Sequence, residues 1–354
     1  MQTGRKYLLD FSREELYRFV NDIGLETFRA EQIFKGIYVQ YLPDFSALTT
    51  ISKDKRKLLN QISTLRRSTI SKISKSPLDN TTKFLWKLSD GLYIESVIIY
   101  EKQRTTLCIS SQVGCVLKCK FCATGKMGFF RNLSSGEIIE QVIVMKEYAE
   151  KNATNIVFMG MGEPLLNLNN VLKACHVLSD PEGMVFARKK ITISTSGVIK
   201  GIKKMADLRV PFPIAISLNA VSDKQRQKIM PIAYKYSLKE LYNSITYYAA
   251  KTKMRVTFEY LLIDGFNTSK ADADLLIKFT NKIPCKINLI PYNPIGERFE
   301  APQNDRLSWF SQYLREHHKT VTIRIRKGID INAACGQLCY EHMKNKNQGG
   351  MKCI

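Results

Sequence analysis

The pattern of apolar and polar positions divides the chain into a helical start and a longer region of alternating strands and helices. Ser12-Arg-Glu-Glu15 has the form of a capping box and precedes apolar residues at helical spacing, which predicts a first helix. Two more helices are predicted over residues 29–38 and 55–62. We therefore expect residues 1–75 to form a small helical accessory domain.

Strand-like segments follow this helical region. Apolar and polar residues alternate over residues 69–73, 83–88 and 93–100, which predicts a small antiparallel element. We expect residues 76–100 to link the accessory domain to the main domain.

From about residue 104 the pattern becomes strand, loop and helix, repeated. Strands are predicted over residues 105–110, 155–159, 190–194, 213–218, 255–262, 286–290 and 320–325. Helices are predicted over residues 135–151, 168–178, 199–207, 238–251, 269–283 and 305–317. This alternation predicts a parallel sheet with outer helices, either doubly wound or closed as a barrel. In a barrel, the chemistry belongs at the carboxyl ends of the strands.

Composition narrows the class of protein. The 354 residues include 54 Lys and Arg against 32 Asp and Glu, a net charge of +22, and 44% of them are hydrophobic. An apolar content this high excludes a disordered or fibrous chain. No run approaches the roughly 18–20 apolar residues that span a bilayer, and the first residues lack the apolar core of a signal peptide. We expect a cytoplasmic protein with no membrane partner, whose excess charge reflects either a polyanionic ligand or a Lys-rich composition.

The chain has nine cysteines, and a structural disulfide framework is improbable in a cytoplasmic protein. The odd number of cysteines strengthens this expectation. Four of them fall within fifteen residues, and Cys115, Cys119 and Cys122 form a CxxxCxxC motif. Three thiolates can hold three irons of a [4Fe–4S] cube and leave the fourth iron open. Zinc is the alternative, although structural zinc sites prefer four protein ligands.

The CxxxCxxC motif, with Phe121 before its last cysteine, resembles the signature of radical S-adenosylmethionine (SAM) enzymes. That resemblance implies a partial TIM-like (β/α)6 barrel, here over residues 101–328, with one three-cysteine [4Fe–4S] cluster. It also implies that SAM chelates the open iron, with Glu163 holding its amino group. The SAM contacts that match the family motifs lie after successive predicted strands: Gly162, Glu163, Ser194, Ser217, Leu218, Asn219 and Asn293. Asn219 stands where many relatives carry His, and its amide can still bond a ribose hydroxyl.

Longer motifs are similar to those of the RlmN family of radical SAM RNA methyltransferases. They are residues 108–115, 158–167, 258–262, 288–294 and 334–338. The family implies methylation at C2 of an adenine in 23S rRNA, near the peptidyl-transferase centre, and of the adenine 3′ of the tRNA anticodon. The related Cfr group methylates C8, and the segments beginning at Glu163 and Lys286 resemble the C2 group more closely.

The resemblance also implies roles for individual residues, in a reaction that consumes two SAM molecules per turnover. Cys335, in the C-terminal segment 329–354, takes a methyl group from the first SAM. A 5′-deoxyadenosyl radical from the second activates that methyl group. Cys108 then releases the product and leaves a transient Cys108–Cys335 disulfide, while Glu95 accepts the C2 proton. From the residues alone, Cys108 and Cys335 are equally compatible with buried apolar side chains, and Glu95 with a solvated strand-face carboxylate.

Two other functions remain open at this point. One is a Cfr-type C8 methyltransferase, and the other is a non-catalytic, zinc-dependent RNA-binding protein. The methyltransferase resemblance implies 23S rRNA and tRNA as partners, bound with the help of the accessory domain over residues 1–75. It also implies an external electron donor such as flavodoxin or ferredoxin. We expect a monomer. Cys175 and Cys285 are expected in the core, whereas Cys339 and Cys353 receive no role.

Overall fold

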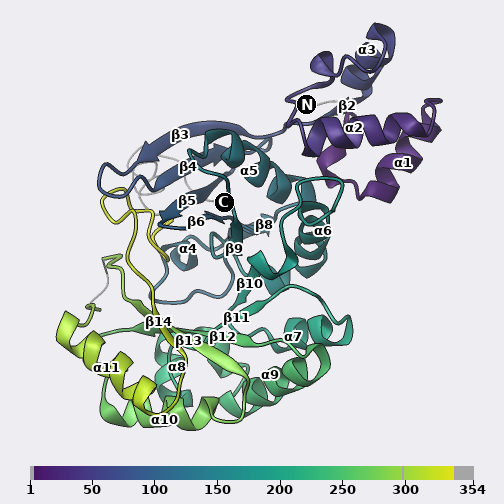
Figure 1. Ribbon diagram of the computed structural model, residues 1–354. Coiled ribbons are helices and arrows are strands. Elements are labelled where there is room, and N and C mark those ends of the chain that lie inside the picture. Colours follow the sequence, from purple (N-terminus) through teal and green to yellow (C-terminus); the bar gives the residue numbers. More distant parts are fainter. Residues whose placement is uncertain (1–3, 297–298, 339–354) are drawn as a thin grey trace.

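The computed structural model describes residues 4–296 and 299–338. Its N-terminal unit consists of α1 (Arg13–Asp22), α2 (Phe28–Tyr38) and α3 (Lys53–Ile62), and it projects from one side of the molecule (Figure 1). Strands β1 (Lys6–Tyr7) and β2 (Ser63–Thr64) pair in parallel and close the base of this unit. Short 3₁₀ turns complete it: η1 (Leu8–Asp10) and η2 (Phe45–Ala47).

The predicted capping box begins α1. Ser12 Oγ accepts a hydrogen bond from the Glu15 amide, and the Glu15 side chain accepts one from the Ser12 amide. Leu16, Phe19 and Val20 are buried on one face of the helix, as their spacing predicts.

Three antiparallel strands lead from the N-terminal unit into the main sheet, as the alternation predicts. They are β3 (Thr69–Lys75), β4 (Thr82–Lys87) and β5 (Tyr93–Glu101), and β5 also pairs antiparallel with β6 (Arg104–Cys108). The linking strands therefore continue the same hydrogen-bonded sheet as the main domain.

The main domain is a curled parallel sheet. After β6, its strands are β9 (Asn155–Phe158), β10 (Ile191–Thr195), β11 (Ile214–Ser217), β12 (Val256–Leu262), β13 (Cys285–Pro291) and β14 (Val321–Ile323). Among the described residues they join the antiparallel strands in one ten-stranded sheet, in the order β14-β13-β12-β11-β10-β9-β6-β5-β4-β3. The regular order of parallel neighbours confirms the partial barrel, with β14 as a short further strand at its edge.

Helices cover the outside of this sheet (Figure 1). They are α5 (Ser135–Tyr148), α6 (Leu168–Leu178), α7 (Ile199–Asp207), α8 (Asp223–Ile229), α9 (Leu238–Thr252), α10 (Lys270–Thr280) and α11 (Asn304–Glu316). The turns η3 (Pro164–Leu166), η4 (Arg188–Lys190) and η5 (Pro231–Tyr234) lie between them. All six helices predicted for the main domain are present, and α8 is an additional short one.

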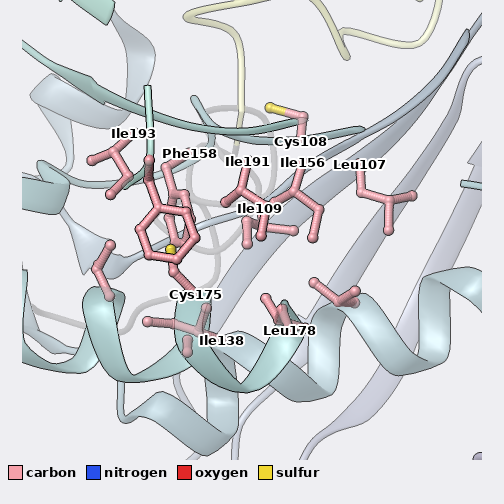
Figure 2. Close-up of a cluster of buried hydrophobic side chains, with 14 of the residues drawn as sticks. Leu107, Cys108, Ile109, Ile138, Ile156, Phe158, Cys175, Leu178, Ile191 and Ile193 are labelled. Carbon is pink, nitrogen blue, oxygen red and sulfur yellow. The ribbon is translucent and has the colours of Figure 1, made fainter. Parts of the chain in front are cut away.

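The core between the sheet and these helices is apolar. Figure 2 shows Leu107 and Ile109 directed toward the helices, whereas the sulfur of Cys108 points to the opposite side of the sheet. This alternation is the normal geometry of a strand, and it places Cys108 on the inner face of the barrel. Cys175 is fully buried in this core, whereas Cys285 is half-buried. Cys339 and Cys353 lie outside the described residues.

The segment after β14 crosses the carboxyl ends of the strands. The Gly328 amide donates to Asp79 Oδ2 at 3.0 Å, and the Asn332 carbonyl accepts from Lys83 Nζ at 3.3 Å. Further along, the Ala123 amide donates to the Gly336 carbonyl at 2.6 Å. The segment that carries Cys335 is thus attached both to the β3–β4 hairpin and to the loop of clustered cysteines. None of the helices in the described part of the chain is long and apolar enough to span a bilayer.

Candidate active site

A cavity opens at the carboxyl ends of the parallel strands, where a barrel is expected to hold its chemistry. It encloses about 1010 Å³, counting the solvent at its mouth. Its wall combines residues that the sequence motifs singled out from six separate parts of the chain: Cys115, Cys119, Cys122, Gly162, Glu163, Ser194, Ser217, Asn219, Asn293 and Cys335. The fold therefore brings nearly all the predicted site residues to one place.

The three clustered cysteines sit on a loop that two short strands hold in shape. β7 (Gln112–Gly114) pairs antiparallel with β8 (Phe129–Asn132), and the Cys115 amide donates to the Gly128 carbonyl at 2.7 Å. The loop ends in the one-turn helix α4 (Ala123–Lys126). Sequence periodicity missed these elements because each is too short to show a period.

The electrostatics of the loop favour a bound cation. Burial raises the pKa of Cys115 to about 12, and burial also raises the pKa of Cys119, to which the nearby Cys122 and Cys115 add. Three thiols crowded in this way ionise readily only when a metal group compensates their charge. No three His, Cys, Asp or Glu side chains in the described part of the chain lie close enough to share one metal ion. A [4Fe–4S] cube does not require that, because each thiolate bonds to a different iron.

Glu163 is held rigidly beside this loop. Its carboxylate accepts hydrogen bonds from the Ser196 amide at 2.8 Å and the Leu165 amide at 3.1 Å. Burial raises its pKa, while these bonds oppose the rise. Gly162 precedes it with φ of 101°, and a Cβ there would lie 2.5 Å from Gln112 Cβ, so the position requires glycine.

The remaining predicted SAM contacts differ in how they meet the cavity. Ser194 and Ser217 line the cavity, whereas Leu218 is buried and does not line it. The Leu218 carbonyl accepts a hydrogen bond from Arg226 Nε at 3.2 Å. Asn219 lines it with φ of 59°, while its Oδ1 accepts from the Leu261 amide at 3.0 Å. One lone pair of Asn219 Oδ1 is therefore used in a hydrogen bond within the protein.

Asn293 presents a buried polar atom that is available to a ligand. It is 5% exposed and lines the cavity, and its Oδ1 has no hydrogen-bond partner. Its Nδ2 donates to the Cys335 carbonyl at 3.2 Å. A buried acceptor without a partner is costly unless a donor arrives. SAM carries ribose hydroxyl and ammonium donors, which fit this wall, and the three thiols fit a cluster, so the site suits both groups.

Cys335 and Cys108 are 227 positions apart in the chain, and their thiols lie near enough for their charges to interact, although Cys108 is buried and does not line the cavity. Cys335 lines the cavity and keeps solvent access, yet burial around its thiol raises its pKa. Burial raises the pKa of Cys108 to about 12, and the charge of Cys335 adds to this shift. Both cysteines are free thiols in this structure.

Glu95, the predicted proton acceptor, does not line the cavity. It is 4% exposed on β5, and its carboxylate approaches Lys83 Nζ at 3.5 Å. The same Lys83 reaches the Asn332 carbonyl, so Glu95 is tied to the segment that carries Cys335. The burial contradicts the interpretation of Glu95 as a solvated surface carboxylate.

Three charged residues at the site were not predicted. Glu259 and Arg324 line the cavity, and Arg226 is fully buried beneath it. Burial lowers the pKa of Arg226 to about 10, against the opposing charge of Cys119. The motif at residues 258–262 contained Glu259 without indicating a role for it, and no local signal marks the two arginines.

The fold and the site define a radical SAM enzyme, a class that uses a [4Fe–4S] cluster with three cysteine ligands together with SAM. The profile of the Radical SAM superfamily matches residues 109–276, which contain the cysteine loop and the strand ends from β9 to β12. A second profile, described as "Ribosomal RNA large subunit methyltransferase N-terminal domain", matches residues 6–65.

Comparison with known proteins identifies the family. The chain is 43% identical to "Probable dual-specificity RNA methyltransferase RlmN" of Petrotoga mobilis, over 98% of this chain and 100% of that protein. It is 43% identical to "Dual-specificity RNA methyltransferase RlmN" of Geotalea uraniireducens, over 93% and 95% respectively. The crystal structure of a radical SAM methyltransferase from Sphaerobacter thermophilus superposes with a TM-score of 0.91 at 38% identity, covering 95% of this chain and 99% of that one. The chain belongs to the RlmN family of RNA methyltransferases, which does not favour a non-catalytic zinc protein.

Proposed function

We propose that this enzyme methylates C2 of an adenine in 23S rRNA and of the adenine 3′ of the tRNA anticodon. The observation that carries the proposal is the place of Cys335 in the cavity wall with the three clustered cysteines, where its carbonyl accepts from Asn293 and its charge acts on the buried Cys108. Relatives at 43% identity are named dual-specificity RNA methyltransferases, which favours two RNA substrates. The resemblance of the segments beginning at Glu163 and Lys286 to the C2 group favours C2 over C8.

Each residue has a distinct task in this proposal. When bound, the cluster and SAM supply a methyl group and a hydrogen-abstracting radical. The Cys335 thiolate carries the methyl group, and its solvent access lets a nucleotide approach. Cys108 attacks the sulfur of Cys335 to free the methylated base, and exchange with external thiols then reduces the resulting disulfide. Glu95, paired with Lys83, accepts the C2 proton.

The N-terminal unit and the basic surface bind the RNA in this proposal, because a charge of +22 favours a polyanion. An external one-electron carrier such as flavodoxin or ferredoxin reduces the cluster. We expect the enzyme to act as a monomer.

Replacement of the two cysteines separates their roles. Cys108→Ala is expected to trap the protein on RNA as a covalent adduct, because Cys335 still transfers its methyl carbon to the base but no thiolate attacks its sulfur to release the RNA. Cys335→Ala is expected to give neither adduct nor product. Denaturing gels and nucleoside mass spectrometry measure both, with Cys175→Ala, in the helix-side core, as the matched control. Normal turnover in either variant would overturn the assignment, and 8-methyladenosine without 2-methyladenosine would contradict the choice of C2.

A further inference from the structure

One charged side chain faces both of the proposed catalytic cysteines. Arg324 follows the last described strand, β14, and its amide donates to the Leu289 carbonyl of β13 at 2.8 Å. Its guanidinium lines the cavity, and one nitrogen lies 3.2 Å from Met159 Sδ, just after β9. The side chain therefore reaches across the inside of the barrel from its open edge.

The acidic groups around Arg324 are the two thiols and two carboxyl groups. Burial disfavours its charge, yet Cys335, Glu259 and Cys108, with a smaller contribution from Glu101, together raise its pKa. In return, Arg324 lowers the pKa of both thiols against the effect of burial. The cation thus favours the reactive, ionised form of each cysteine.

A row of polar side chains crosses the neighbouring strands, and its carboxylate lines the same cavity as Arg324. Glu259, Asn288 and Thr322 are direct neighbours on β12, β13 and β14. Asn288 Nδ2 donates to Glu259 Oε2 at 2.9 Å, and Thr322 Oγ1 donates to Asn288 Oδ1 at 2.9 Å. Burial raises the pKa of Glu259, while the charge of Arg324, the Asn288 hydrogen bond and the charge of Lys286 oppose that rise.

We propose that Arg324 is a shared positioning residue for the two cysteines, with its guanidinium against Met159 in the wall of the cavity that Cys335 also lines. In methyl transfer, the Cys335 sulfur forms a bond to the methyl carbon as the sulfonium–methyl bond of SAM breaks, and S-adenosylhomocysteine leaves. In resetting, two external thiols reduce the Cys108–Cys335 disulfide and become oxidised themselves. Arg324 stabilises the thiolate in both steps. This inference rests on the proposed function.

The test compares Arg324→Met, which removes the charge, with Arg324→Lys, which keeps it. Both substitutions are made in the full-length Cys335→Ala protein loaded with its cluster, so that the reactivity of Cys108 is measured without a contribution from Cys335. We expect iodoacetamide to alkylate Cys108 about tenfold more slowly in the Met variant, the effect of one pKa unit on a thiolate population, and Lys to restore most of the rate. Peptide mass spectrometry gives the rates. Arg326→Met is the control, because its guanidinium bonds the Tyr292 carbonyl instead.

A second measurement uses both cysteines. Equilibration with glutathione gives the stability of the Cys108–Cys335 disulfide. We expect this disulfide to be harder to reduce in Arg324→Met, because the two thiolates that reduction forms are less stable without the guanidinium charge. An unchanged alkylation rate and an unchanged disulfide equilibrium in Arg324→Met would overturn the inference. Failure of the proposed function has a different signature, namely absence of methyladenosine and of the RNA adduct in proteins that carry Arg324.

Discussion

At the scale of single residues, Asn293 uses one amide for two purposes. Its nitrogen holds the backbone of Cys335, while its oxygen remains open inside the cavity. A buried acceptor without a partner destabilises the protein by itself, so its presence is explained by a ligand that supplies the donor.

Asn293→Ala separates ligand binding from stability. Removing an unpaired oxygen offsets the loss of one hydrogen bond, so we expect the free energy of unfolding to change by less than about 1 kcal/mol. SAM binding to the cluster-loaded enzyme is expected to weaken roughly tenfold or more, as measured by calorimetry. Asn281→Ala, at the opposite end of the barrel after α10, is the control. A SAM affinity equal to that of the parent would contradict this role.

At the scale of elements, the barrel strands and helices were predictable because each is long enough to show its period. α6 and α7 have the predicted bounds, and the parallel order follows from their alternation with strands. The β7–β8 pair was missed because its strands are only a few residues long and the cysteine loop separates them.

The site was predictable only where the motif itself is local. Cys115, Cys119 and Cys122 lie within eight residues, whereas Arg324 gains its neighbours through closure of the barrel. An arginine just after a short strand resembles any solvated basic residue until the packing around it is known. Its partners come from β6, β12 and the C-terminal segment, and no sequence period connects them.

Two glycines of the β7–β8 pair give a matched test of the cysteine loop. A Cβ on Gly114 would overlap the Gly128 carbonyl, whereas a Cβ on Gly128 meets nothing within 4 Å, and both residues have positive φ. Gly128→Ala should therefore cost about 1 kcal/mol, from backbone strain alone. Gly114→Ala should also displace the Cys115 backbone and reduce the iron content per chain after anaerobic reconstitution. Equal iron content in the two variants would show that the close approach is unimportant.

At the scale of the whole molecule, one buried carboxylate joins the N-terminal unit to the barrel. Glu140, on α5, accepts hydrogen bonds from Tyr7 Oη at 2.6 Å and from the amides of Arg67 and Ser68 at 3.1 and 3.2 Å. Gly136, one turn earlier, allows the Tyr7 ring to lie against the helix. These contacts set the direction in which the N-terminal unit projects.

Tyr7→Phe should loosen this joint without touching the cavity. Loss of a buried hydrogen bond to a charged acceptor costs about 1.5–3 kcal/mol. We expect faster limited proteolysis of the segment between β2 and β3, with iron content unchanged. Tyr148→Phe, on an exposed position of the same helix, is the control. Identical cleavage rates for the two variants would mean that Glu140 does not hold the units together.

The attachment of the Cys335 segment also has a consequence in time. During synthesis, the cysteine loop is complete about 200 residues before Gly336, whose carbonyl later accepts the Ala123 amide. The Thr124 hydroxyl donates to the Leu338 carbonyl at 3.5 Å, and this partner is likewise synthesised only near the end of the described chain. A growing chain therefore presents its three cysteines uncovered on the side that the C-terminal segment later occupies. Covering of the cluster loop and arrival of the methyl-carrying thiol are a single event, the last in assembly of the site.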